Sequence, residues 1–370
     1  MEKQNLLQTE QNEDTKGDTL IKDLTTGSVS QKLIHFSIPL ILANLMQVLY
    51  NVVDMIVVGQ FIDSAGISAV SNGGDIMHMV TILCIGFSTA GQIIIAQLVG
   101  KNDREGIKKA IGTLFSFMGI IAVIITILSL FLVDWFIITV NVPLEARVAT
   151  KEYCVIFFVG MVFIFGYNAV SAILRGMGDS KRPFIFITIA TFLNLILDLL
   201  FVEDLGIKGV AFTTVIAQAT SFIFSIIYLY SKRDAFGFDF KLKSFVIHGP
   251  SLKFLLKLGL PLGLLYGSVT ISKLFINSWV NSYGVILSAL TGIGTKIGQV
   301  ASIVTSAFGT AGATMIGQSV GAKKISRINR IISVSLGWGL LYTGFLSIIF
   351  ALFSDQIFGL FTRDAEVLSR

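Results

Sequence analysis

Nine long apolar segments constrain this chain more than any other feature of its sequence. Each is long enough to cross the hydrocarbon core of a bilayer, which takes about 20 residues in a helix. Because a bilayer offers no water to backbone N–H and C=O groups, spans of this kind must be helical. The sequence therefore predicts an all-α integral membrane protein, a polytopic helical bundle with spans at roughly residues 33–58, 68–99, 108–132, 150–174, 183–202, 208–230, 253–280, 285–316 and 327–352.

The composition and the charge distribution agree with this class. Of the 370 residues, 54% are hydrophobic and only 14% are charged, about half the charged share of an average soluble chain. Residues 1–32 are polar and contain no apolar signal-peptide core, so we expect them to form a tail. Lys and Arg concentrate in this tail and in every second loop, which places the N-terminus in the cytoplasm. The net charge of +5 thus reports topology, and no nucleic-acid partner is expected.

An internal repeat divides the chain. The stretch from Thr89 to Gly100 recurs from Thr310 to Gly321, at an offset near 221 residues. Both copies end in the cytoplasm, so the repeats are parallel and predict two lobes related by an axis along the membrane normal. The repeat also indicates that the chain stops where a tenth span would begin, as a truncated twelve-span protein would. We expect a six-span first lobe (33–230), a cytoplasmic linker (231–252) and a partial second lobe of three spans (253–370).

The first span carries an acid. Asn44, Gln47, Asn51 and Asp54 are spaced three, four and three residues apart and share one helix face, and Tyr50 lies one turn before Asp54. An ionisable group in the bilayer core costs ~2.5–3.5 kcal/mol on insertion scales, so such groups usually face a cavity and carry function. The competing interpretation is an acid near the end of a span that reaches the headgroups.

A second acid lies in the fifth span. Asn194 and Asp198 are four residues apart and therefore share a face. Counted from the start of the span at 1.5 Å per residue, Asp198 lies ~22 Å along the helix, in the outer half of the membrane. Thr213 and Thr214 of the sixth span reach the same level, as does Asp54. The sequence predicts a site in the outer half of the first lobe, made by Asp54, Asn194, Asp198 and a threonine of span six.

The donor atoms of this site are carboxylate, amide and hydroxyl oxygens. Such ligands suit a hard cation such as Na⁺. Two close, desolvated carboxyl groups can equally carry a proton. The sequence leaves both ions open, and beyond this coupling ion no cofactor is expected.

Other residues that often carry chemistry do not form a pattern here. Cys84 and Cys154 have no metal-ligand spacing and are interpreted as small apolar fillers, and the three histidines are scattered. No phosphate-binding loop is present, so the chain is not expected to hydrolyse ATP. Lys273 in span seven either pairs with an acid of spans beyond the ninth or reaches the headgroups, and Lys296 is expected to reach the headgroups.

Several stretches together resemble the multidrug and toxic compound extrusion (MATE) transporters, over about residues 27–370. They are IPLILANLMQVLYNVVDMIVVGQ, GFSTAGQIIIAQLVGKND, LRGMGDSKRP, GIKGVAFTTVIAQ and GTAGATMIGQSVGAKK. The chain looks most similar to the DinF-type branch, in which the first lobe carries the cation site. Span seven lacks the acid that the other main branch uses, which argues against a second-lobe cation site. The resemblance implies a cation- or proton-binding site at Asp54, Asn194, Asp198 and Thr214 (or Thr213), beside a substrate cavity lined by Tyr50, Asn51 and Gln47.

The resemblance implies a secondary-active exporter in the cell membrane. It would exchange Na⁺ or H⁺ for organic, often cationic, small molecules, and work as a monomer among membrane lipids. One alternative is a flippase for lipid-linked precursors, which would need a cationic central cavity and is disfavoured by Asp54 and Asp198. An intramembrane enzyme would need a catalytic constellation that the spans lack. A fragment that does not transport is the remaining alternative, because of the early stop.

Overall fold

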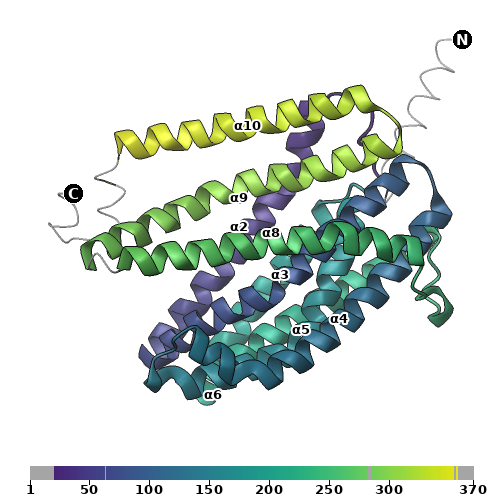
Figure 1. Cartoon of the computed structure of the whole chain (residues 1–370). Helices are drawn as coiled ribbons and strands as arrows, with labels where there is room; N and C mark the ends of the chain where they lie inside the picture. The colour runs from purple at the N-terminus through teal and green to yellow at the C-terminus, as the bar shows by residue number, and fades with distance from the viewer. Residues whose placement is uncertain (1–20, 63, 282–284, 354–355, 357–370) are drawn as a thin grey trace, which may run out of the picture.

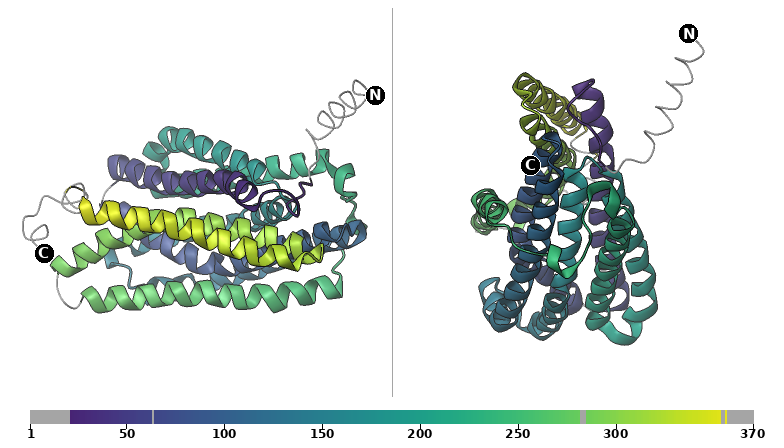
Figure 2. Two further views of the ribbon diagram at one scale, coloured as in Figure 1. Left: turned by 90° about the horizontal axis from the view of Figure 1, so that it is seen from above. Right: turned by 90° about the vertical axis from the view of Figure 1, so that its right-hand side faces the viewer.

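The computed structural model of the chain describes residues 21–62, 64–281, 285–353 and 356, and within these ranges every regular element is a helix. Short helices lie in the connections: η1 (Leu144–Ala146), α7 (Arg233–Phe236) and η2 (Leu242–Ser244). The long helices are α2 (Val29–Phe61), α3 (Ser64–Gly100), α4 (Arg104–Thr139), α5 (Arg147–Gly176), α6 (Lys181–Ser231), α8 (Gly249–Asn281), α9 (Val285–Gly321) and α10 (Ile325–Leu352). In Figure 1, α8, α9 and α10 run roughly parallel to one another, and α2 to α6 are inclined to them; Figure 2 gives two further views.

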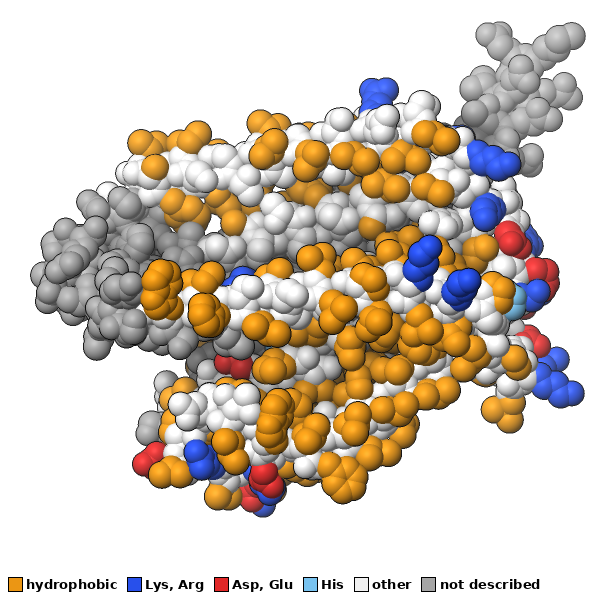
Figure 3. Space-filling view, in the orientation of Figure 1, with side chains coloured by type: hydrophobic (Ala, Val, Ile, Leu, Met, Phe, Trp, Pro, Cys, Tyr) orange, Lys and Arg blue, Asp and Glu red, His pale blue; other side chains and the backbone are white. Residues whose placement is uncertain are grey.

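The surface of these helices is that of a membrane protein. Among the described residues, seven helices are long and apolar enough to cross a membrane, namely α2 to α6, α8 and α10. Large apolar side chains are exposed along them, such as Phe131 of α4 (82%) and Leu340 of α10 (71%), and they cover much of the face in Figure 3. An apolar surface of this extent is stable in contact with lipid but unfavourable in contact with water. The predicted all-α membrane class is confirmed.

Helix α6 contains two of the predicted spans in one element of 51 residues. The chain turns at Gly206, where φ is 57° and ψ is −138°, a conformation that glycine adopts without steric cost. The two arms then fold back on each other, and across the turn the hydroxyl of Thr213 donates a hydrogen bond to the carboxyl of Asp198. The turn falls in the predicted connection between residues 202 and 208 and places polar residues of both arms at one level.

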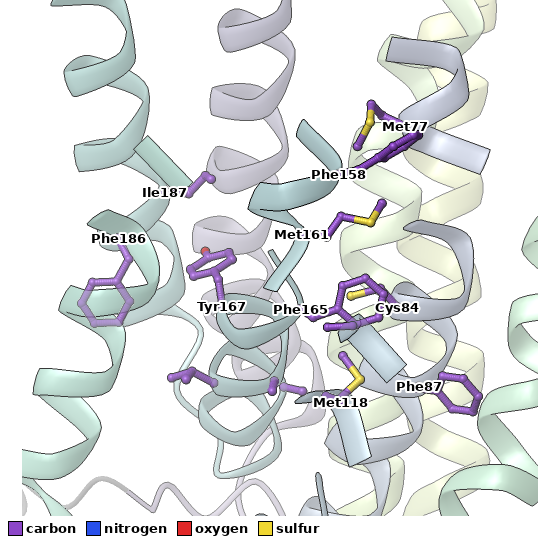
Figure 4. Close-up of a cluster of buried hydrophobic side chains, with 14 of the residues drawn as sticks. Met77, Cys84, Phe87, Met118, Phe158, Met161, Phe165, Tyr167, Phe186 and Ile187 are labelled. Carbon is purple, nitrogen blue, oxygen red and sulfur yellow. The ribbon is translucent and has the colours of Figure 1, made fainter. Parts of the chain in front are cut away.

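The buried core of the first half lies between α3, α4 and α5. Phe158, Met161 and Phe165 recur every three or four residues on one face of α5 and are fully buried, together with Cys84 of α3 and Met118 of α4 (Figure 4). In lipid there is little hydrophobic driving force between helices, so close packing stabilises such a core. Both cysteines are buried free thiols.

The two copies of the sequence repeat meet at equivalent residues. A Cβ atom added to Gly100 would lie 2.0 Å from the carbonyl oxygen of Gln318, and one added to Gly321 would lie 2.0 Å from the carbonyl oxygen of Gln97. Only glycine allows α3 and α9 to approach this closely. Helix α3 also packs along α8, and α2 packs along α9. The two copies of the repeat are therefore in contact along several helices. The division into lobes at residues 33–230, 231–252 and 253–370 stays a prediction.

Residues 21–28, which we call the N-terminal clamp, join the ends of three helices. The backbone N–H of Lys22 donates to the carbonyl of Met177, just after α5. The N–H of Leu24 donates to Oε1 of Gln318 on α9 at 2.8 Å. The guanidinium of Arg327 on α10 donates to three carbonyls of the clamp at 2.8–3.1 Å. The clamp therefore fastens the end of α5 to the ends of α9 and α10.

Asp23 organises the clamp internally. Its carboxylate accepts hydrogen bonds from the N–H and hydroxyl of Thr25 and from the hydroxyl of Thr26. Partial burial opposes ionisation of Asp23, but the hydrogen bonds from Thr26 and Thr25 and the charge of Lys32 outweigh it and lower its pKa to about 2. A depressed folded-state pKa stabilises the clamp above the ordinary carboxyl pKa near 4. That contribution is lost as the pH falls from about 4 to about 2.

We expect Arg327→Ala to release the N-terminal clamp. Hydrogen bonds to charged groups contribute ~1.5–3 kcal/mol each, and this change removes three of them. Amide hydrogen exchange at Lys22 and Leu24, followed by mass spectrometry, should become at least about tenfold faster. Arg330→Ala is the matched control, because Arg330 lies one turn further along α10 and is exposed. Equal protection of the clamp in both variants would contradict this prediction.

Candidate functional site

Two buried acids from distant parts of the sequence lie together. Asp54 comes from the second half of α2 and is 4% exposed, and Asp198 comes from the first arm of α6 and is 0% exposed. Their carboxyl groups interact directly with each other. Helix α2 packs along α6, which brings the two side chains to one level.

Polar groups from both arms of α6 surround the acids. The hydroxyl of Thr213, on the second arm, donates to Oδ1 of Asp198. Nδ2 of Asn194, one turn before Asp198, lies 3.5 Å from the same hydroxyl. Asn194 and Thr213 are each 1% exposed, so the group is sealed from water.

Several oxygen atoms at this place have no hydrogen-bond partner among the described residues. They are Oδ1 of Asp54, Oδ2 of Asp198, Oδ1 of Asn194 and the hydroxyl of Tyr50, all buried. A buried polar atom without a partner costs ~1–3 kcal/mol, and more if it is charged. The oxygens therefore form a set of acceptors whose partner is not a described protein group. Such a set fits a small hard cation, or a proton shared between the carboxyl groups.

The charges of the pair also require such a partner. No salt bridge of the described residues involves Asp54 or Asp198. Two carboxylates in contact and away from water repel each other strongly, because the low local dielectric screens them little. A cation or a proton between them removes that repulsion, so the pair can take up and release one positive charge.

The structure places some of the residues predicted for this site in contact with the acids and others elsewhere. Asp54, Asn194 and Asp198 lie together, and Tyr50 has both acids among its electrostatic neighbours. Among the span-six threonines, the hydroxyl that contacts Asp198 belongs to Thr213. That of Thr214 donates to a backbone carbonyl of its own helix, at 2.8 Å.

The other polar residues on the predicted face of α2 do not all lie at the acidic cluster. Asn44 lies outside the acidic cluster and donates to the carbonyl of Ile303 and the hydroxyl of Ser306 on α9, at 3.3 and 3.2 Å. Gln47 is exposed. The side chain of Asn51 lies outside the described residues, so its place in a substrate cavity stays a prediction.

The two lysines singled out from the sequence are not part of this cluster as described. Lys273 is exposed on α8, and the side chain of Lys296 lies outside the described residues. Their suggested roles stay untested.

Sequence reasoning missed Tyr153 of α5. It is 5% exposed and has Asp54 and Asp198 among its electrostatic neighbours. Its ring lies over Gly73 of α3, where a Cβ would come within 2.5 Å of it. A lone tyrosine in an apolar span gives no signal in the sequence, although a glycine opposite it leaves room for the ring.

A second polar contact was also missed. Arg175 at the end of α5 donates from Nε to Oε1 of Gln92 on α3, at 2.9 Å. Nε2 of Gln92 donates in turn to the carbonyl of Thr310 and the hydroxyl of Thr314 on α9, at 3.0 and 2.7 Å. This chain of hydrogen bonds links the two copies of the repeat and lies apart from the acidic cluster.

Comparison with known proteins decides the family. The family model described as MatE matches residues 39–200 and 261–370. The chain belongs to the MatE family. Members of this family are membrane transporters, so the protein is a multi-pass transporter and not an enzyme.

Named relatives and solved structures agree with this assignment. The chain is 29% identical to the probable multidrug resistance protein YoeA of Bacillus subtilis, over 92% of this chain and 75% of that protein. It is 24% identical to the multidrug export protein MepA of Staphylococcus aureus, over 92% and 75%. An outward-facing MATE transporter of the MOP superfamily superposes with a TM-score of 0.85 at 25% identity, over 93% of this chain and 77% of that one. The chain thus spans about three quarters of the length of these relatives.

Proposed function

We propose that this MatE-family protein exports organic, often cationic, small molecules across the cell membrane in exchange for Na⁺ or H⁺. The observation that carries the proposal is the buried pair of Asp54 and Asp198, whose free oxygens need a positive charge. Relatives of this chain are named multidrug resistance and multidrug export proteins, which supports this substrate class. The N-terminus would lie in the cytoplasm, as the distribution of Lys and Arg favours.

The acidic pair would couple the movement of the drug to the movement of the ion, because both would compete for the same half of the protein. When a cation or proton binds, the repulsion between the carboxylates is relieved and α2 can approach α6 closely. When it leaves, the repulsion returns, and the carboxylates would attract a cationic substrate into the substrate cavity predicted beside Tyr50. Both fluxes then depend on one conformational equilibrium, and rocking of the two halves would expose the cavity to either side in turn.

Transport by the purified protein in liposomes tests this proposal. Ethidium, a fluorescent organic cation, serves as the probe, and an inward Na⁺ gradient or an inward pH gradient is imposed separately. A protonophore during the Na⁺ experiment keeps the two ions apart. We expect one of the gradients to accelerate ethidium export over protein-free liposomes. Export that neither gradient accelerates would overturn the proposal and favour a chain that does not transport.

A further inference from the structure

A groove of about 890 Å³ lies where α2 and α6 begin, beside the N-terminal clamp. It is separate from the acidic cluster, which lies further along the same two helices. On α2 its lining residues extend from Gln31 to Leu42, so it follows the helix for ~16 Å from the end of the bundle toward the middle. Because the groove starts at the end of the bundle and follows a membrane-spanning helix, we infer that it extends from the headgroup region into the hydrocarbon region of one leaflet.

The two ends of the groove differ in chemistry. Lys22 of the clamp, Lys32 of α2 and Lys181 of α6 line the end at the surface of the bundle. Ile38, Leu42 and Phe184 line the part that extends along the helices. In Figure 3, Lys and Arg side chains, together with some Asp and Glu, gather at the end of the molecule near the N-terminus, and apolar side chains cover the flank.

The cationic end is available to an anion. Asp23 is the acid that lines the groove, and hydrogen bonds from Thr25 and Thr26 already satisfy its carboxylate. Lys22 and Lys181 form no salt bridge with any described residue, and both are exposed. Three lysines against one carboxylate leave the local charge net positive, although Asp23 acts on Lys32.

The apolar part is available to a chain of methylene groups. Ile38 is 49% exposed and Leu42 is 38% exposed, although they face a concave surface. An inorganic anion would contact the cationic end alone and make no use of the apolar part of the groove. A molecule with an anionic head and an acyl tail matches both ends at once.

We propose that this groove binds one anionic phospholipid, with its phosphate between Lys22, Lys32 and Lys181 and an acyl chain along Ile38, Leu42 and Phe184. The bound lipid would hold the clamp against α2 and α6, the helices that carry the acidic pair. This binding goes beyond the proposed function and does not depend on the identity of the drug or the coupling ion.

Native mass spectrometry of the full chain tests the proposal, after extraction into a mild detergent and addition of equimolar phosphatidylglycerol and phosphatidylcholine. A lysine near an anionic lipid surface contributes ~1 kcal/mol, or about fivefold in affinity. Lys22→Gln with Lys181→Gln should therefore reduce retention of the first phosphatidylglycerol by at least about tenfold. Only the backbone of Lys22 is used in the clamp, so this change leaves its hydrogen bonds intact.

Two further variants test whether lipid binding depends on this groove or only on positive charge at the surface. Lys101→Gln with Lys109→Gln removes the same charge from exposed positions at the same end, outside the groove, and should keep the phosphatidylglycerol bound. Ile38→Trp fills the apolar part, leaves every charge in place and should also prevent binding. Equal retention of the two lipids by the unchanged protein would overturn the proposal. So would an equal loss in both charge variants, or displacement of the lipid by free glycerol phosphate.

Discussion

Asp54→Asn and Asp198→Asn should each abolish export driven by an ion gradient, with at least about a tenfold loss in the initial rate. Asparagine keeps the shape and polarity of the side chain but removes the charge that a cation or proton must compensate. Coupling between two sites is typically worth ~1–3 kcal/mol, or fivefold to 150-fold, and either change removes its source. Movement of the drug down its own gradient should persist. Folding should tolerate the change, because losing a charge inside the membrane is not costly in itself.

The measurement is ethidium export from liposomes with an imposed ion gradient, beside expression level and melting temperature. Asp204→Asn is the matched control, since Asp204 lies six residues beyond Asp198 on α6 and is exposed. Thr213→Val should also lower the rate, and more than Thr214→Val, because Thr213 is the one that contacts Asp198. Normal gradient-driven export by both aspartate variants would leave these acids as structural hydrogen-bond acceptors.

Gly321→Ala should lower the melting temperature by roughly 5 °C and prevent transport. The added Cβ would lie 2.0 Å from the carbonyl oxygen of Gln97, a backbone atom that cannot rotate away. Overpacking of this kind costs ~1–3 kcal/mol and forces α3 and α9 apart. Since the N-terminal clamp also holds Gln318 of α9, the change should loosen the clamp as well.

The control for this prediction is another glycine of the same half. Gly337 lies within α10, and a Cβ added there meets nothing within 4 Å. Alanine at position 337 should be neutral or stabilise the helix by ~0.5–1 kcal/mol, because glycine is unfavourable inside helices. A scan of thermal unfolding by fluorescence-detected size exclusion compares the two variants. Equal melting temperatures would show that α3 and α9 can separate here without cost.

The helices and the acidic pair follow from the sequence because each rests on local spacing. An apolar segment must become a helix in lipid, and residues four apart such as Asn194 and Asp198 must share its face. Depth along a helix then placed Asp54 and Asp198 at one level. These arguments need no knowledge of which helices are neighbours.

What the sequence could not decide depends on packing. Thr213 and Thr214 are consecutive, and only the angle at which the second arm of α6 meets the first brings Thr213 to Asp198. The polar face of α2 looks continuous in the sequence, yet its neighbour is α9 at Asn44 and α6 at Asp54. Tyr153, an electrostatic neighbour of both acids, lies in a span without any polar spacing pattern. Each of these outcomes is set by neighbours that are distant in the chain.

The turn at Gly206 has a consequence for how this protein enters the membrane during synthesis. Asn194, Asp198 and Thr213 all lie on the hairpin that this turn creates, so both arms can insert as one unit. An acid that enters lipid with its hydroxyl partner already beside it avoids much of the cost of exposing a bare carboxyl group to hydrocarbon. The part of the acidic cluster that lies on α6 is therefore expected to be assembled before α8, α9 and α10 have left the ribosome.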